Sequence, residues 1–329
     1  MKKLLAILLC LVMLLSMSAM ADTKPVTLKI GYGVADTTTL GKAVQTWADR
    51  VTEATEGRYV FEIYPSGQLG ALNEMIEAVD LNQLDITMND SGQLCSIVPE
   101  TNLLSMPMLI KDYEGWKALC NGPIGDALIE DVAATTNITV LGWIFNGFRE
   151  VISATEITSL EGAKDVIIRS PDADAYVRTL KLLNFTPTAL PFAEVYSALQ
   201  TGVVQATETT YEQFVLNSYF EEATHMVETN HLVATMGMFF NSKVWNSISP
   251  EDQAIMLQIN DEVFGQCSDD VYAEAEGYKK QLMEEHGCTL YCYTEEEQAE
   301  VLSRFQDFWG EYAATNNCTD LLEEAIKLR

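Results

Sequence analysis

Basic side chains are scarce in this sequence. Its 329 residues include 20 lysines and arginines against 48 aspartates and glutamates, which gives a formal net charge of −28 at pH 7. A surface of this sign repels nucleic-acid phosphates and anionic lipid headgroups, so we expect no nucleic-acid partner. The few arginines become informative, because each is a rare cation in an acidic chain.

Histidine and the common catalytic motifs are scarce or missing as well. The chain has three histidines and no pair of cysteines at the close spacing of a zinc finger, so we expect no metal site. It lacks a G-x-S-x-G elbow, an H-E-x-x-H pair and a P-loop. Residues 31–33 (GYG) begin a dinucleotide fingerprint, but Asp36 occupies the position of its third glycine. We therefore expect a binding protein without a cofactor and not an enzyme.

The one apolar run of note is at the N-terminus. Two lysines precede the apolar residues 4–15, and a small-residue stretch ends with Ala19-Met20-Ala21. This order predicts a secretory signal peptide over residues 1–21, cleaved after Ala21, and hence a periplasmic protein. The run is too short to span a bilayer, and no later apolar segment is long enough, so we expect no insertion into the membrane.

Six of the seven cysteines follow this segment. An oxidising compartment permits disulfides among them, but the connectivity cannot be read from a sequence. Cys288 and Cys292 are four residues apart in an expected strand, roughly 13 Å at strand rise, which is too far for them to pair with each other.

Strand and helix patterns alternate along the first two thirds of the chain. This alternation, without a run of hairpins, predicts an α/β fold with a sheet of parallel strands. The length exceeds what one core usually serves, so we expect two lobes joined by strands that cross a hinge. The expected strands are 27–33, 59–64, 84–88, 138–145, 165–169, 203–207 and 232–240, and the expected helices are 38–55, 70–82, 171–183 and 192–200.

A long helix is expected in the C-terminal third. Ser249 is a good N-cap, Pro250 suits the first helical position, and acids follow in the first turn. The helical pattern continues to His286, a length of about 55 Å at helical rise. Because neither lobe alone needs such a helix, we expect it to bridge both.

Residues 165–172 (DVIIRSPD) form the strongest local constellation. A buried strand ends in Arg169 just before a helix that begins with proline, and ligands of open α/β folds lie beyond the carboxyl ends of strands. A guanidinium offers two parallel donors to a carboxylate, so Arg169 is a candidate for binding an acid. The alternative is a surface ion pair with one of the many acidic residues.

Four segments show a family resemblance. The segments are 64–70 (YPSGQLG), 147–149 (GFR), 168–171 (IRSP) and 191–204 (PFAEVYSALQTGVV). With them the chain resembles the DctP family, the solute-binding proteins of TRAP transporters, over essentially its whole length after the signal peptide. The resemblance implies a bilobal, type II-like α/β fold whose two lobes close on a small organic acid.

This resemblance also implies an organisation and a partner. We expect lobe I to comprise residues 22–146 and 235–274, and lobe II to comprise residues 147–234 and 275–329. The protein would act as a monomer that delivers its acid to the membrane subunits of a TRAP transporter. Two alternatives remain open: a receptor of another transporter class or a sensor on the same fold, and an exported enzyme, which would convert its ligand where a receptor returns it unchanged.

Six residues are the candidate binding site. The resemblance implies that Arg169 pairs with the substrate carboxylate, that Arg149 is a second pocket arginine, and that Phe192 is an aromatic wall. Thr209 stands where the family often has asparagine, and so replaces an amide with a shorter hydroxyl.

Asn89 and Asp90 align with pocket residues of the family, although N-D-S-G would also make a good turn. An ionised Asp90 in the cleft would disfavour a second carboxylate. We therefore expect a monocarboxylate with a hydroxyl, amino or aromatic group rather than a C4-dicarboxylate.

Overall fold

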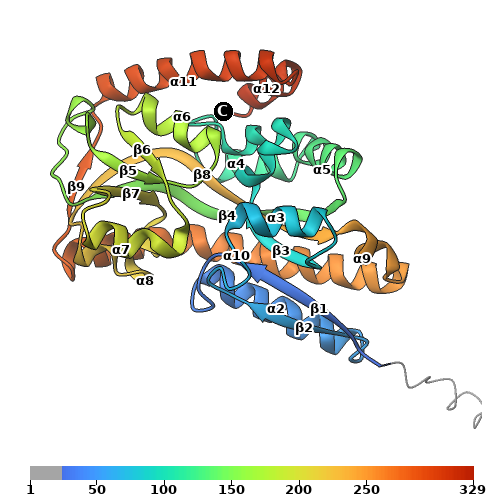
Figure 1. Ribbon diagram of the computed structural model, residues 1–329. Coiled ribbons are helices and arrows are strands. Elements are labelled where there is room, and N and C mark those ends of the chain that lie inside the picture. Colours follow the sequence, from blue (N-terminus) through green and yellow to red (C-terminus); the bar gives the residue numbers. More distant parts are fainter. Residues whose placement is uncertain (1–23) are drawn as a thin grey trace, which may run out of the picture.

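The computed structural model describes residues 24–329, and the expected signal peptide lies outside the described residues. Strands and helices alternate and assemble into one sheet with helices on both of its faces (Figure 1). The expected α/β fold is therefore confirmed. No helix within residues 24–329 is both long and apolar enough to cross a membrane.

Nine strands form the sheet. In chain order they are β1 (Val26–Tyr32), β2 (Tyr59–Tyr64), β3 (Ile86–Asp90), β4 (Ile138–Ser153), β5 (Ile167–Ser170), β6 (Thr186–Ala189), β7 (Ala206–Thr209), β8 (His225–Asn241) and β9 (Thr289–Cys292). Their order across the sheet is β2-β1-β3-β8-β4-β7-β5-β6, with β9 paired to β8.

Helices cover the sheet and close its ends. The α-helices are α2 (Thr39–Ala54), α3 (Leu72–Asp80), α4 (Tyr113–Cys120), α5 (Pro123–Thr135), α6 (Asp174–Leu182), α7 (Val195–Gln200), α8 (Tyr211–Leu216), α9 (Ser242–Ser247), α10 (Pro250–Glu284), α11 (Glu295–Thr315) and α12 (Thr319–Lys327). Short 3₁₀ helices are η1 (Ser91–Ser96), η2 (Pro99–Ser105), η3 (Glu161–Ala163), η4 (Phe192–Glu194) and η5 (Tyr219–Glu221).

The sheet contains the expected parallel strands, but it is mixed. β1 is parallel to β2 and β3, and β5 is parallel to β6 and β7. However, β8 runs antiparallel to β3 and β4, and β4 runs antiparallel to β7. The hydrophobic pattern of a strand reports which faces are buried, but it carries no information on strand direction.

β4 and β8 are the two long strands, with 16 and 17 residues, and they connect the β1–β3 half of the sheet to the β5–β7 half (Figure 1). Their pairing shifts register between Val140 and Trp143 and again between Phe145 and Phe148. Gly142 and Gly147 lie within these shifts at φ values of 149° and 100°, a conformation that favours glycine. The two bulges therefore bend the strands where they pass from one half to the other.

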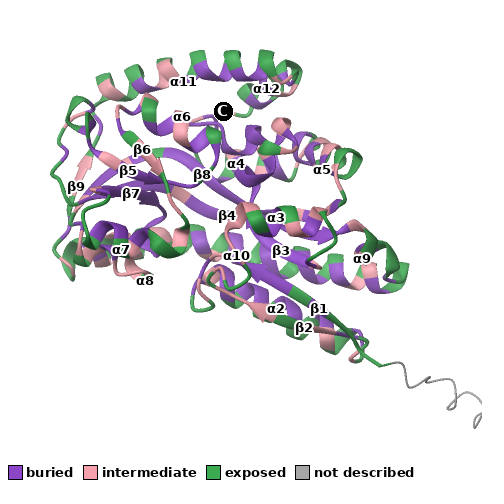
Figure 2. Cartoon of the chain, in the orientation of Figure 1, coloured by how far each residue is buried: buried purple, intermediate pink, exposed green. Residues whose placement is uncertain are grey.

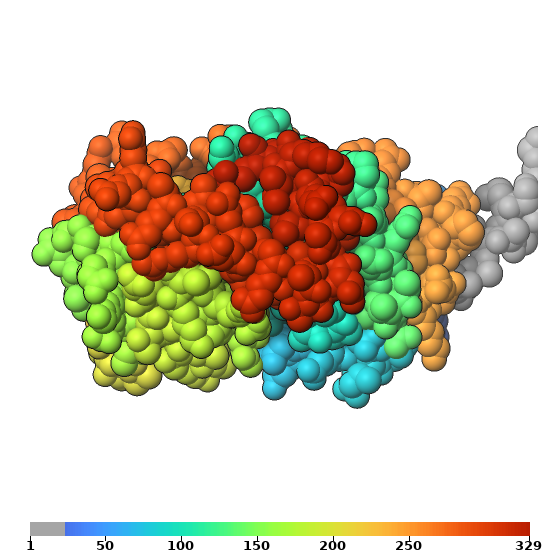
Figure 3. Space-filling model, turned by 90° about the horizontal axis from the view of Figure 1, so that it is seen from above, coloured from blue at the N-terminus to red at the C-terminus, as the bar shows by residue number. Residues whose placement is uncertain are grey.

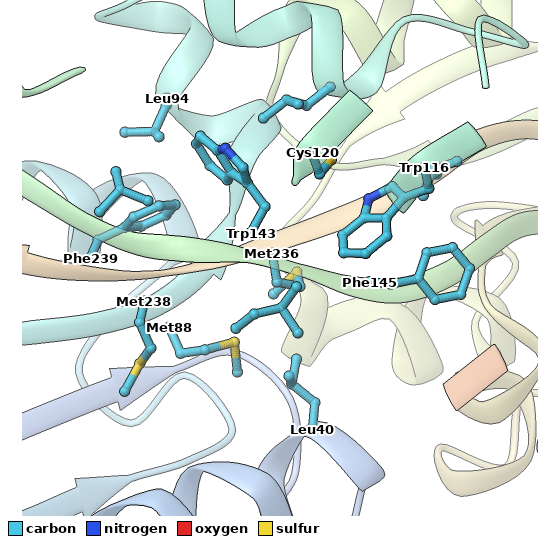
Figure 4. Packing of buried hydrophobic residues seen from close by; sticks show 14 of the residues in the cluster. Leu40, Met88, Leu94, Trp116, Cys120, Trp143, Phe145, Met236, Met238 and Phe239 are labelled. Atoms are coloured by element: carbon cyan, nitrogen blue, oxygen red, sulfur yellow. The ribbon is translucent and has the colours of Figure 1, made fainter. Parts of the chain in front are cut away.

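The largest apolar cluster extends along β4 and β8, and a second cluster, which includes Val195, Phe214 and Met226, lies in the β5–β7 half. Figure 2 shows buried residues on both of these strands and on the inward faces of the helices. In Figure 4, Leu94 and Trp143 lie on one side of the paired strands, and Met88 and Met238 lie on the other. Trp116 is also buried, and its Nε1 donates to Thr235 Oγ1 at 3.0 Å, which satisfies the indole inside the core.

The long C-terminal helix is present as α10, with 35 residues. The Ser249 side chain accepts from the Asp252 backbone N–H at 3.1 Å, and Pro250 is the first helical residue, so the helix starts where the sequence predicts. α10 packs against α2, β4 and α8, elements of both halves of the sheet (Figure 1).

The last two helices cross the molecule on the opposite side from α10. In Figure 3 the residues of α11 and α12 extend from the light-green residues to the blue ones. Trp309 of α11 donates through Nε1 to the Pro107 carbonyl at 2.8 Å, and Glu311 pairs with Arg178 of α6 at 3.0 Å. The six described cysteines are all unpaired.

Candidate functional site

The strand ends of both halves of the sheet meet around one small cavity. We call it the central cavity; it measures about 50 Å³ and is bordered by Asp90, Arg149, Arg169, Phe192 and Thr209, with Gln93, Asn146 and Gln213 among the other lining residues. A wider cavity of about 480 Å³ shares Gln93, Arg169 and Phe192 with it. The central cavity is therefore the inner end of a larger cleft between the two halves.

Arg169 is a buried cation without a protein counterion. It lies near the carboxyl end of β5 and is 2% exposed. Its Nε donates to the Leu190 carbonyl at 3.0 Å, whereas its two Nη groups donate to no residue within 24–329 and no carboxylate there is within ion-pair distance. Burial lowers the pKa of Arg169 to about 10, and the nearby charge of Arg149 adds to this effect.

Phe192 lies beside this guanidinium. The centre of the Arg169 guanidinium is 5.6 Å from the centroid of the Phe192 ring. The ring stands at the start of η4, directly after Pro191, and borders both the central cavity and the wider one. It therefore forms a wall over the donor groups that Arg169 presents to the cavity.

Arg149, in contrast, has a protein counterion. Its Nε and Nη2 donate to the two carboxylate oxygens of Glu208, at 2.7 Å for Nη2, and Nη2 also donates to the Glu208 carbonyl at 3.0 Å. Burial alone would raise the pKa of Glu208, but the charge of Arg149 and the hydrogen bonds of His231 and Arg149 outweigh it and lower the pKa to about 2. The two residues form a neutral, bidentate pair in the cavity wall.

His231 completes this buried network. Its Nε2 lies 3.3 Å from Glu208 and its Nδ1 lies 2.7 Å from the Thr229 hydroxyl. Burial lowers the pKa of His231, and the bond to Glu208 opposes this effect only in part. Both ring nitrogens therefore have protein partners in the buried network.

Asp90 ends β3 and faces the central cavity from the other half of the sheet. The Tyr176 hydroxyl lies 2.9 Å and 2.8 Å from its two oxygens, and the Gly92 backbone N–H donates to it at 2.7 Å. Burial raises the pKa of Asp90, although the charge of Arg149 and the hydrogen bonds of Tyr176 and Gly92 oppose the rise.

Asn89 lies behind the cavity and not in its wall. Its Nδ2 donates to the Leu72 carbonyl at 2.9 Å, and its Oδ1 accepts from the Asp90 backbone N–H at 2.8 Å. Successive side chains of a strand point to opposite faces, so Asn89 turns away where Asp90 turns inward. Thr209 is 3% exposed and borders the cavity. The structure thus brings five of the six candidates to one cavity, while the sixth supports the Asp90 backbone.

Sequence reasoning missed four polar contributors: Gln213 of α8, which borders the cavity, and three others. Asn146 borders the cavity and its Oδ1 is buried without a hydrogen-bond partner among residues 24–329. Gln93 lies on η1, the 3₁₀ helix that begins directly after Asp90, and Tyr176 lies on α6. Their positions give some signal: Asn146 precedes the G-F-R segment, and Tyr176 is in the helix that follows Arg169.

This arrangement is suited to holding an anion. It offers the donors of one unpaired cation at one end and the acceptors of Asp90 and Asn146 at the other. A small cavity at the strand ends between two α/β halves defines a binding protein for a small solute. The comparison with known families agrees. Residues 30–316 match the bacterial extracellular solute-binding protein family 7 (DctP), and the chain belongs to this family, whose members are extracytoplasmic receptors of TRAP transporters.

Two relatives of known ligand are similar in sequence. The sialic acid-binding periplasmic protein SiaP of Vibrio cholerae is 27% identical over 74% of this chain and 76% of its own length. The 2,3-diketo-L-gulonate-binding periplasmic protein YiaO of Escherichia coli is 26% identical over 70% of each chain.

Solved structures establish the bilobal fold. A TRAP solute-binding protein of Haemophilus influenzae with bound L-gulonate has a TM-score of 0.87 at 20% identity and covers 92% of this chain and 99% of its own. A sugar acid-binding protein of Advenella mimigardefordensis with galactonate has a TM-score of 0.87 at 21% identity; the match covers 94% of this chain and 100% of that protein. A TRAP solute-binding protein of Sulfurospirillum deleyianum with bound succinate has a TM-score of 0.84 at 24% identity; the match covers 92% of this chain and 99% of that protein.

Proposed function

We propose that this protein binds a small organic acid through Arg169 and delivers it to the membrane subunits of a TRAP transporter. The buried, unpaired guanidinium of Arg169 is the observation that carries the proposal. An unpaired cation is costly to bury, because desolvation has no compensating partner. A substrate carboxylate would supply the partner with two parallel, charge-assisted hydrogen bonds.

The substrate class follows from the rest of the cavity wall. Glu208 neutralises Arg149, so one cation remains for one carboxylate. Asp90 and the free Oδ1 of Asn146 accept hydrogen bonds and favour hydroxyl or amino groups on the substrate. A second carboxylate there would face Asp90. We infer a hydroxylated or amino monocarboxylate, the class of the gulonate and galactonate in similar structures, rather than the succinate of another.

Binding would require the lobes to close. We assign residues 22–146 and 235–274 to lobe I and residues 147–234 and 275–329 to lobe II. With this division Asp90 belongs to lobe I, and the two pocket arginines belong to lobe II. The central cavity, at about 50 Å³, has room for a few water molecules only, so a six-carbon acid needs the halves to part before it enters. A ligand that touches both lobes favours the closed state by its differential affinity.

The cellular setting completes the proposal. The segment 1–21 would direct export and be removed after Ala21, which places the mature receptor in the periplasm. It would work there as a monomer and release its acid, unchanged, to the transporter.

A ligand screen tests the proposal directly. Thermal-shift assays against galactonate, gluconate, lactate and succinate, followed by calorimetry, should find at least one hydroxylated monocarboxylate that raises the melting temperature. Small-angle scattering at saturation should then show a smaller radius of gyration. Tight binding of succinate with none of the monocarboxylates would refute the inferred class, and failure of every carboxylate would refute the role of Arg169.

A further inference from the structure

A second cavity lies on the other side of β4 from the central cavity. We call it the α10 cavity; it measures about 370 Å³ and is bordered by β4, α8, β8 and α10. Arg149 and Glu150 are consecutive on β4, and strand geometry points them in opposite directions. Arg149 borders the central cavity, whereas Glu150 borders the α10 cavity, which the binding of an acid does not use.

The lining of the α10 cavity is acidic. It includes Glu150, Glu212, Glu228, Glu274 and Glu276 and contains no lysine or arginine. Lys279, just outside, pairs with Glu228 at 2.8 Å and with Glu276 at 3.1 Å. Within residues 24–329 no cation lies within ion-pair distance of the other three carboxylates.

Neutral groups hold these three carboxylates in place without neutralising them. Glu212 accepts from the Thr39 backbone N–H at 2.8 Å, and Glu274 accepts from the Thr39 hydroxyl at 2.9 Å. Glu150 accepts from the backbone N–H groups of Thr229 and Asn230, the latter at 2.9 Å. Burial raises the pKa of Glu150 to about 8, so Glu150 is mostly protonated at pH 7, and burial also raises the pKa of Glu212. The negative charge that the cavity offers to a ligand therefore rests on its other glutamates, among which Glu274 has no cation within ion-pair distance in the described part of the chain.

Aromatic side chains and one unsatisfied hydroxyl form the rest of the wall. Phe148, Tyr211, Tyr272 and Tyr278 border the cavity, and Tyr272 is 50% exposed despite its size. Thr210 borders it as well; this residue is 6% exposed, and its Oγ1 is buried without a hydrogen-bond partner in the described part of the chain.

Carboxylates beside aromatic faces attract organic cations, since the ring quadrupole and the negative charge act in the same direction. A free Thr hydroxyl accepts an N–H, which an ammonium with protons on nitrogen provides and a quaternary one does not. A bare divalent metal fits poorly, because no group of three side chains that could hold a metal ion is found among the described residues. We propose that the α10 cavity binds a small protonated primary or secondary amine with an apolar or aromatic body.

Benzylamine is a suitable probe, and benzyl alcohol is its neutral control of nearly equal shape. Calorimetry at pH 7 with the full-length mature protein should show benzylamine binding, and benzyl alcohol should bind at least about tenfold more weakly because it brings no charge to the carboxylates. Glu274→Gln and Tyr272→Ala, both at exposed positions, should each weaken benzylamine binding about three- to tenfold. Asp261→Asn removes one exposed acid from the same helix away from the cavity and should leave binding unchanged.

Three results would overturn the proposal. Equal binding of benzyl alcohol would mean that the cavity takes up apolar molecules without regard to charge. Wild-type affinity for benzylamine in Glu274→Gln and Tyr272→Ala would place the amine elsewhere in the molecule. An equal loss of benzylamine affinity in Asp261→Asn would mean that the effect comes from the net charge of the chain and not from the cavity. Melting curves recorded beside the titrations check that each variant is folded; Tyr272→Ala should melt lower than the wild type, because it loses the ring stacked on Tyr113 at 4.7 Å. None of these outcomes depends on whether an acid binds at Arg169.

Discussion

The Tyr176 hydroxyl lies 2.8 Å from one carboxylate oxygen of Asp90 and 2.9 Å from the other. Asp90 ends β3 and Tyr176 belongs to α6, so this contact joins the two halves of the sheet at the edge of the central cavity. Gly92 makes the approach possible: a Cβ atom there would lie 2.6 Å from Tyr176 Cε2, closer than side chains pack. The hydrogen bond between Tyr176 and Asp90 therefore connects the two proposed lobes, and we call this contact the latch.

Gly92→Ala should weaken acid binding by at least about tenfold, because the added methyl group pushes Tyr176 away from Asp90 and opposes closure. Calorimetry with the acid found in the ligand screen measures the effect. Gly265→Ala on α10 is the matched control: no atom lies within 4 Å of its added Cβ, so its affinity should be that of the wild type, and the helix should gain about 0.5–1 kcal/mol. Unchanged affinity in Gly92→Ala would show that the latch has no part in binding.

Arg169→Ala should abolish acid binding at micromolar concentrations and leave the protein folded. Two charge-assisted hydrogen bonds contribute about 1.5–3 kcal/mol each, so a loss of at least about 100-fold is expected. Arg169→Lys keeps the charge but loses the two-pronged geometry, and it should bind far more weakly than the wild type. Melting curves recorded beside the titrations separate this result from the alternative, since a purely structural Arg169 would lose stability and keep affinity.

Arg149 should behave in the opposite way, because it is half of a buried ion pair. Glu208→Gln leaves its charge without a counterion and should cost about 3–5 kcal/mol of the free energy of unfolding, measured by urea denaturation. Replacing both residues by methionine should cost less than the sum of the two single replacements, because no charge remains buried alone. Strictly additive losses would contradict the pairing.

Glu150 should make stability fall as the pH rises from neutral to mildly alkaline. Burial raises its pKa to about 8 in the folded protein, from an ordinary value of 4.5. Between these values the folded state holds a proton that the unfolded chain has lost, so the free energy of unfolding decreases with pH and levels off above about pH 8.

Urea denaturation between pH 6.5 and 9 covers this change, and comparison with Glu150→Gln cancels the contribution of His231, whose pKa is lowered by burial in both proteins. The wild type should lose about 1–2 kcal/mol more than Glu150→Gln over this range. Parallel curves for the two proteins would mean that Glu150 is already ionised at neutral pH.

Much of the fold could be predicted from the sequence. The periodic patterns located β2 and the start of α10 correctly, and they placed β1 within one residue at each end. They underestimated β4 and β8. The missed second half of β4 contains Asn146 and Arg149, and the missed first part of β8 contains His231, where a strand in a core would carry apolar residues. Arg149 and His231 can be buried because both bond to Glu208 of β7, and Asn146 borders the cavity; such contacts between distant segments leave no periodic signal.

The site could be predicted in part, and the limit is physical. Five of the six candidates border one cavity, since the ends of neighbouring strands meet at one edge of the sheet. The family resemblance assigns the substrate carboxylate to Arg169 and makes Arg149 a second pocket arginine, but the sequence gives no sign that Arg149 has a counterion. That depends on Glu208, 59 residues from Arg149, reaching one guanidinium and not the other. Asn89 is outside the wall because neighbours on a strand face opposite ways.

The long pairing of β4 with β8 also bears on how the molecule unfolds. Each proposed lobe is built from separate stretches of chain, and the two strands supply ladder hydrogen bonds to both. Neither lobe can lose its part of the sheet without exposing the edge of the other, and α10 packs against elements of both. Opening at the hinge and loss of structure are thus separate events: the strands can bend at their bulges while the ladder stays intact, and when the ladder breaks, both lobes come apart in one cooperative transition.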